Sequence, residues 1–207
     1  MYSSGRGVPQ NYAEAVKWYR LAADQGVALS QNSLGEMYSN GSGVPKNDAE
    51  ALKWYRLAAD QGDARAQFNL GFMSEQGQGM PQNDVEAVTW YRKAADQGLA
   101  LAQNHLGYRY IFGKGVPQNY TEARKWFRLA ADQGRADAQY VLGSLYMDGR
   151  GVPQNYVNAY MWLNLAAAQG DQDAVKNRDL VKQNMTTAQI AEAQKLAREW
   201  KPKTTPH

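Results

Sequence analysis

The sequence predicts an all-α fold, an α-solenoid in which helical hairpins stack one on another. The first observation is a period of 36 residues, at which a tryptophan, a proline and a glycine each recur five times. The second is a helical pattern of apolar residues on both sides of a glycine-rich turn in each period. One such unit cannot bury its apolar face alone and must stack on its neighbours. The recurring tryptophans are Trp18, Trp54, Trp90, Trp126 and Trp162, and the same interval joins Pro9 to Pro153 and Gly26 to Gly170.

The first half of each unit is predicted to be a helix. In the unit that starts at residue 28, Ala28, Leu34 and Tyr38 fall on one helical face, and copies begin at residues 64, 100 and 136. A Leu-Gly pair returns in every copy, first as Leu34-Gly35. Because glycine inside a helix costs about 1 kcal/mol relative to alanine, its recurrence predicts that a neighbouring helix approaches closely there.

A glycine-rich turn separates the two halves of the unit, seen first as GSGVP over residues 41–45. The glycines allow positive φ, and the proline prevents the first helix from continuing. The turn follows a helix rather than a strand and lacks the Lys-Ser/Thr ending of a phosphate-binding loop. The sequence therefore argues against a nucleotide site, and it predicts no cofactor.

The second half of each unit is also predicted to be a helix. It starts at an asparagine expected to cap the helix, with a glutamate three residues later that can complete a capping box, as in Asn47 and Glu50. The fifth copy keeps the cap as Asn155 but carries Asn158 in place of the glutamate. An Asp-Gln-Gly sequence ends the helix with a left-handed glycine. Apolar residues cover more than half of its girth, so the tryptophans are interpreted as core rather than as cofactor contacts.

The repeat array is predicted over residues 1–171, as about five units of which the first is incomplete. Met1-Tyr2 falls in register with Met37-Tyr38, inside a first helix. A truncation that removed earlier sequence is favoured over the alternative, in which a lone helix at about 11–25 caps the array.

The C-terminal end departs from the repeat, as expected of a terminal cap. Residues 172–200 are predicted to form capping helices, the last of which starts near Thr187 and ends near Trp200. Thr186 and Gln189 have the spacing of a capping box. Residues 201–207 are expected to be a disordered tail.

Composition limits the classes of function. The 23 basic and 20 acidic residues give a net charge of +3. Pairs such as Glu14 and Lys17 favour a solvated helix face over a nucleic-acid surface. There is no cysteine for a disulfide or a thiol nucleophile. No run approaches the ~20 apolar residues of a membrane helix. The N-terminus lacks a signal-peptide pattern, so the compartment stays open: periplasmic or secreted if a signal peptide was truncated, otherwise cytoplasmic.

The unit resembles the Sel1-like repeat, a relative of the tetratricopeptide repeat with a slightly longer period. The resemblance implies a right-handed superhelix of antiparallel helix pairs, with a concave surface for partners. Many members are bacterial, often exported, and act as adaptors in signalling, envelope or host-contact processes. The residues that carry the resemblance are Leu34-Gly35, Tyr38, Gly41-Ser42-Gly43-Val44, Asn47, Ala51, Trp54, Ala58-Ala59 and Gly62.

Five units allow a comparison within the chain. Positions identical in every unit serve the shared fold, whereas first-helix positions that differ are free to recognise a ligand; these are 29, 32, 33, 36 and 40 and their equivalents. First helices line the concave side of such superhelices, so aromatic and basic residues there predict a partner-binding groove. Alternatively, some of them, Phe68 and Phe112 especially, fill gaps between repeats. The candidate residues are Phe68, Phe72, His105, Tyr108, Arg109, Phe112 and Tyr140.

The sequence favours a non-enzymatic scaffold, a monomer that binds a peptide or protein on its concave face and does not bind nucleic acid. The only histidines, His105 and His207, are far apart in the sequence, so no metal site or histidine relay is expected. The alternative is a binder or hydrolase of β-lactam or cell-wall material, which the resemblance suggests through a cysteine-rich branch of the family. This chain lacks the paired cysteines of that branch.

Overall fold

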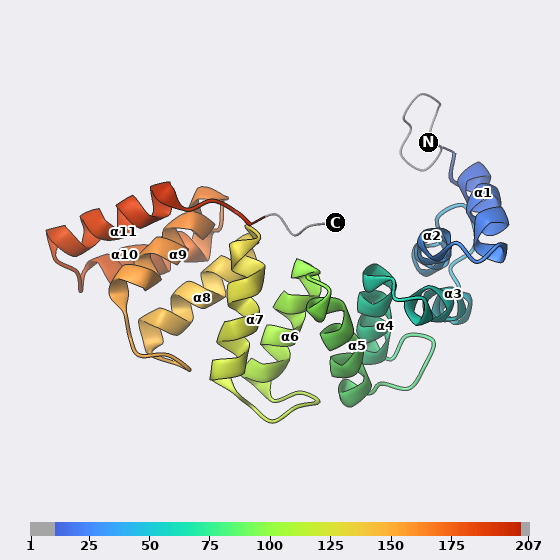
Figure 1. Ribbon diagram of the computed structural model, residues 1–207, viewed down its shortest axis with the longest axis horizontal. Helices are drawn as coiled ribbons and strands as arrows, with labels where there is room; N and C mark the ends of the chain where they lie inside the picture. Colours follow the sequence, from blue (N-terminus) through green and yellow to red (C-terminus); the bar gives the residue numbers. More distant parts are fainter. Residues whose placement is uncertain (1–10, 204–207) are drawn as a thin grey trace. The chain divides into compact units, whose positions relative to one another are not determined.

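The computed structural model describes residues 11–203, which form helices in sequential antiparallel pairs (Figure 1). The chain divides into two compact units: the first contains α1–α5 and ends at Gln97, and the second contains α6–α11 and begins at Gly98. The all-α repeat architecture predicted from the period is confirmed. The helices are α1 (Tyr12–Asp24), α2 (Ala28–Asn40), α3 (Asp48–Asp60), α4 (Ala64–Gln76), α5 (Asp84–Asp96), α6 (Ala100–Phe112), α7 (Tyr120–Asp132), α8 (Ala136–Asp148), α9 (Tyr156–Ala168), α10 (Gln172–Lys182) and α11 (Thr187–Glu199).

The asparagine caps of the second helices are present as predicted. The Asn47 side chain accepts hydrogen bonds of 3.1 Å from the backbone N–H groups of Ala49 and Glu50. In two copies the glutamate expected to complete the capping box forms a salt bridge instead: Glu14 pairs with Lys17, and Glu122 pairs with Lys125. A full capping box is found at the start of α11, where Thr186 and Gln189 exchange hydrogen bonds as predicted.

The Leu-Gly pairs mark close helix contacts, which confirms the prediction made from the recurring glycine. A Cβ atom added at Gly35 would lie 2.6 Å from the ring of Tyr55, and one added at Gly107 would lie 2.7 Å from the ring of Phe127. Real Cβ atoms do not approach ring atoms this closely. The first and second helices of a repeat therefore pack at a distance that only glycine allows.

The recurring tryptophans are not all core, and for Trp18 the interpretation is wrong. Trp54 is 5% exposed and Trp162 is 1% exposed, whereas Trp18 is 59% exposed. Trp54 belongs to a core cluster with Leu34, from the first helix of its own repeat, and Val16, from the preceding repeat. In residues 11–203 no helix precedes α1, so Trp18 has no corresponding surface to pack against in this part of the chain.

The C-terminal helices close the second unit. Helices α10 and α11 both pack against α9. Residues 201–203, which the sequence assigns to a disordered tail, instead make defined contacts: the backbone N–H of Lys203 donates to the backbone oxygen of Asp132 at 2.7 Å. The remaining tail residues, 204–207, and the register of Met1-Tyr2 lie outside the described residues. Among helices α1 to α11, none is long and apolar enough to cross a membrane.

Candidate partner-binding surfaces

In the first unit, the two candidate residues differ in exposure. Phe72 on α4 is 38% exposed. Phe68, one turn earlier, is half-buried, and its ring centroid lies 5.5 Å from that of Tyr91 on α5. Phe68 therefore packs against the second helix of its own repeat rather than in a gap between repeats, whereas Phe72 is exposed.

In the second unit, two candidate rings stack on α6. Tyr108 and Phe112 lie nearly parallel with centroids 6.2 Å apart, and Tyr108 also makes an edge contact of 5.0 Å with Phe127 of α7. Tyr108 is half-buried by this contact, whereas Phe112 is 63% exposed. Phe112 therefore presents the largest exposed apolar surface among the candidate residues, and it does not fill a gap between repeats.

The basic character expected of this surface does not come from Arg109. That side chain is only 4% exposed, so the interpretation of Arg109 as a groove residue is wrong. Helix position explains the difference: Arg109 directly follows Tyr108 and therefore points about 100° away from it around the helix axis. His105 is half-buried on the same helix.

Tyr140 of α8 belongs to a polar network on the first helices of the second unit. Its hydroxyl accepts a hydrogen bond of 3.4 Å from the side-chain amide of Asn177 on α10. One turn before Tyr140, Asp137 accepts a hydrogen bond of 3.0 Å from Asn104 of α6 and forms a salt bridge with Arg135 at 2.6 Å. First helices of successive repeats are thus joined by polar side chains at the variable positions.

The charged side chains near Tyr108 affect the pKa of its hydroxyl group. Burial raises the pKa of its hydroxyl above the ordinary value, and the negative charges of Asp137 and Asp171 raise it further, while Arg135 acts in the opposite direction. The Tyr108 hydroxyl therefore stays protonated at neutral pH and is available as a hydrogen-bond donor. It faces a mixed acidic and basic surface rather than a purely basic one.

An open hollow of about 550 Å³ lies at the start of α8. It is lined by Arg135, Asp137, Gln169 and Asp171, together with the backbone around Gly134 and Gly170. Sequence reasoning missed Arg135 and Asp171 because it compared only positions inside the first helices. A comparison extended by one residue before each helix finds them: the equivalents are Val27, Asp63 and Leu99, so the residue type at this position varies along the chain, although Asp63 and Asp171 are alike.

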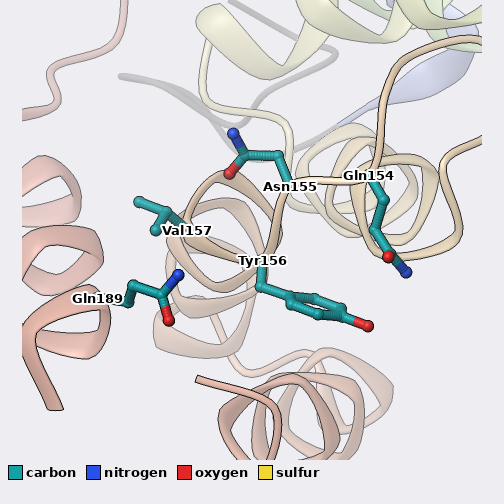
Figure 2. A pocket seen from close by; sticks show the side chains of 5 residues that line it. All are labelled: Gln154, Asn155, Tyr156, Val157 and Gln189. Atoms are coloured by element: carbon teal, nitrogen blue, oxygen red, sulfur yellow. The ribbon is translucent and has the colours of Figure 1, made fainter. Parts of the chain in front are cut away.

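A second hollow, of about 340 Å³, lies between the starts of α9 and α11 (Figure 2). Its polar groups are engaged in holding the backbone. Asn155 caps α9, Gln154 donates to the backbone oxygen of Met147 at 2.7 Å, and Gln189 accepts from the backbone of Thr186 at 2.9 Å. These bonds explain the residue types without a ligand.

The described part of the chain contains no group of three or more His, Cys, Asp or Glu residues that could hold a metal ion. The two variable patches on the first helices, one in each unit, are therefore the features of this fold that packing explains least. We call them the α4 patch, with Phe72, and the α6–α8 patch, with Tyr108, Phe112, Arg135, Asp137 and Tyr140.

Comparison with known proteins matches this architecture. The Sel1 repeat family matches the chain five times, at residues 1–27, 28–63, 64–99, 100–134 and 136–171. A search of curated proteins finds no match.

Solved structures give the same result. The chain is 38% identical to a protective antigen present in uropathogenic Escherichia coli strains, with a TM-score of 0.87 over 95% of this chain and 43% of that one. It is also 38% identical to a Sel1 repeat protein from Oxalobacter formigenes, with a TM-score of 0.79 over 86% of this chain and 51% of the other. The chain thus spans about half the length of these two proteins or less. An immunity protein from Pseudomonas aeruginosa, at 24% identity and a TM-score of 0.54 over 94% of this chain and 74% of that one, shares the fold.

Proposed function

Because this chain belongs to the Sel1 repeat family, we propose that it is a non-enzymatic scaffold that binds a peptide or protein on the first-helix surfaces of its repeats. The observation that supports this most strongly is Phe112, which is 63% exposed on α6. The exposed ring is stacked on Tyr108. Aromatic side chains, phenylalanine among them, are enriched at the centres of protein interfaces.

The repeat itself explains why these positions are free to recognise a partner. Recurring residues such as Gly107 and Phe127 hold the helices of a repeat together. The residue in register with Phe112 is Asn40 in one repeat and Gln76 in another. The fold therefore tolerates polar residues at this position, and an exposed phenylalanine there is not required for packing. A binding role accounts for it better than a structural role.

The polar part of the α6–α8 patch would supply orientation. Arg135, Asp137 and Asp171 surround the hollow at the start of α8. Charged groups of both signs beside an aromatic pair form the mixed rim that is typical of interfaces, in which the apolar centre supplies affinity and the rim supplies specificity. We expect a partner segment with an apolar anchor flanked by charged residues.

Photo-crosslinking tests this proposal position by position. A photoreactive phenylalanine analogue is placed at Phe72 or Phe112, and in a separate chain at Leu129, which is 47% exposed on a second helix. The proposal expects crosslinks to one discrete partner from the first-helix positions and not from Leu129. Equal crosslinking from Leu129 would contradict it. Sustained hydrolysis of a chromogenic β-lactam, abolished by a point substitution, would contradict the non-enzymatic assignment.

A further inference from the structure

The C-terminal segment of the described chain, residues 200–203, lies in an extended conformation on the second helices of its own unit, where Figure 1 shows it leaving α11 toward α7. The Trp200 ring packs edge-on against Trp162 of α9, with centroids 6.2 Å apart. Three residues later, the Lys203 ammonium group reaches the Asp132 carboxylate of α7 at 2.9 Å, and the Lys203 N–H donates to the Asp132 backbone oxygen. We call this segment the strap.

Four residues form the site that holds the strap. Arg128 lies 5.0 Å above the Trp162 ring and donates to Asp132 at 2.9 Å, so it fixes both the aromatic platform and the carboxylate. Gly134 lies beneath the strap, because a Cβ atom added there would be 3.6 Å from Pro202 and 3.8 Å from Trp200. The strap site therefore recognises an aromatic ring and, three residues later, a lysine.

The repeat reproduces this site in the first unit, two periods earlier. The equivalent residues, each 72 positions before its counterpart, are Arg56, Asp60, Gly62 and Trp90. Arg56 and Asp60 keep the same one-turn spacing on α3, and Trp90 of α5 packs against a core cluster that includes Leu52 and Tyr55 of α3. The arginine, the aspartate, the open glycine and the aromatic platform are thus all present.

Lys93 lies over the Trp90 ring at 4.1 Å, much as Arg128 lies over Trp162, but no described contact in this copy corresponds to those that the strap makes. Asp132 is 7% exposed beneath the strap, whereas Asp60 is an exposed residue. Trp162 is 1% exposed, whereas Trp90 is half-buried. A Cβ atom added at Gly62 would meet nothing within 4 Å among the described residues.

We propose that the Asp60–Trp90 site binds an extended peptide segment of a partner protein, with an aromatic residue followed three positions later by a lysine. The aromatic ring would pack edge-on against Trp90, and the lysine would pair with Asp60, as Trp200 and Lys203 pack and pair in the second unit. This surface lies on the second helices, so the proposal does not depend on the first-helix patches.

The copy one period earlier provides a matched control. Its residues are Arg20, Asp24, Gly26 and Trp54, but Trp54 is only 5% exposed. The Arg20 guanidinium lies over both the Trp54 ring, at 5.8 Å, and the Tyr38 ring, at 5.7 Å. Because Trp54 is buried within its own unit without a strap, this copy should not accept an aromatic residue, although Asp24, like Asp60, is exposed.

The test uses the full chain and a dye-labelled synthetic peptide, EWKPKTT, with the sequence of residues 199–205, followed by fluorescence anisotropy. The strap stays on its own site, because an intramolecular segment has an effective concentration on the order of millimolar. We expect saturable binding that Asp60→Asn weakens about fivefold, as for an exposed ion pair, and that Asp24→Asn leaves unchanged. Replacing the peptide lysine that corresponds to Lys203 by alanine should cause the same loss, and replacing its tryptophan should abolish binding.

Several results would overturn the proposal. One is a peptide that binds only after Asp132→Asn has released the strap, which would place it on the vacated site. Another is an equal loss of affinity in Asp24→Asn and Asp60→Asn. A concentration-dependent dimer that Asp60→Asn abolishes would assign the site to a second copy of this chain instead. Thermal melts of both variants should match the parent, because each replaces an exposed residue.

Discussion

Gln61 donates a hydrogen bond of 2.6 Å from its side-chain amide to the side chain of Gln31, which joins the end of the second helix of a repeat to the first helix of the same repeat. Gln31 is 4% exposed and in turn donates to the backbone oxygen of Ala23 at 3.1 Å. Satisfied polar networks of this kind fix the register of an otherwise apolar interface. The same bond recurs between Gln97 and Gln67, Gln133 and Gln103, and Gln169 and Gln139.

This relationship predicts that Gln61→Ala destabilises the fold, whereas Gln25→Ala does not. Gln25 is in register with Gln61 at the end of α1, and both residues are exposed, but only Gln61 has a glutamine partner among the described residues. Losing the Gln61 bond should lower the free energy of unfolding by about 1 kcal/mol. Urea denaturation of the two variants measures the difference. Equal effects would show that the glutamine ladder contributes nothing specific to the repeat interface.

Gly107→Ala should destabilise the chain, although alanine is the better helix former. The added methyl group would meet the Phe127 ring at 2.7 Å, and overpacking of this kind costs about 1–3 kcal/mol. In an exposed helix the same substitution would stabilise by about 1 kcal/mol. The sign of the change in the free energy of unfolding, measured by denaturation, therefore shows whether overpacking or helix propensity dominates. A stabilised variant would contradict the close approach of α6 and α7.

The recurring tryptophans should differ in their contribution to stability. Trp162 is 1% exposed, so Trp162→Ala should cost about 3–5 kcal/mol. Trp18 is 59% exposed, and Trp18→Ala should cost less than about 1 kcal/mol. Denaturation followed by far-ultraviolet circular dichroism compares the two. A large loss on replacing Trp18 would mean that another part of the chain covers it.

High pH should destabilise the first unit through Tyr55. Burial raises the pKa of the Tyr55 hydroxyl above its ordinary value, and the charge of Glu36 adds to the effect. A pKa raised in the folded state gives stability that is fully present below the unfolded pKa of about 10 and is lost as pH rises toward the folded value. Stability should therefore fall above about pH 10, and less steeply in Tyr55→Phe. Urea melts between about pH 8 and pH 11 test this; identical slopes would contradict it.

The repeat architecture was predictable from the sequence because the residues that packing requires recur at every period. Leu34-Gly35 recurs because each first helix meets a ring or side chain of its second helix, and Asn47 recurs because each second helix needs a cap. The exposure of Trp18 could not be predicted in this way, because the burial of a residue depends on its neighbours as well as on its type. Gln31 and Gln61 were visible as recurring residues, but their hydrogen bond could be known only once the two helices of a repeat were placed together.

The exposure of the candidate residues was only partly predictable. Phe72 and Phe112 stand at variable positions and are exposed, whereas Phe68, also at a variable position, is half-buried. Arg109 is in register with Met37 and Met73, and all three are buried. A step of one residue rotates a side chain by about 100° around the helix, so exposure depends on where the neighbouring helices lie. The contacts of the strap with Asp132 were not predictable, since residues 201–203 form no regular element whose packing a periodic pattern could reveal.

The most direct measurement is the affinity of the crosslinked partner for three forms of the full chain: the parent, Phe112→Ala and Leu129→Ala. Both substitutions remove an exposed apolar side chain from the second unit, one on a first helix and one on a second helix. If the first-helix surface binds the partner, Phe112→Ala should weaken binding by about 30-fold, as expected of an interface hot spot, with an unchanged melting curve, while Leu129→Ala binds like the parent. Unchanged affinity in Phe112→Ala, or a greater loss in Leu129→Ala, would contradict the assignment.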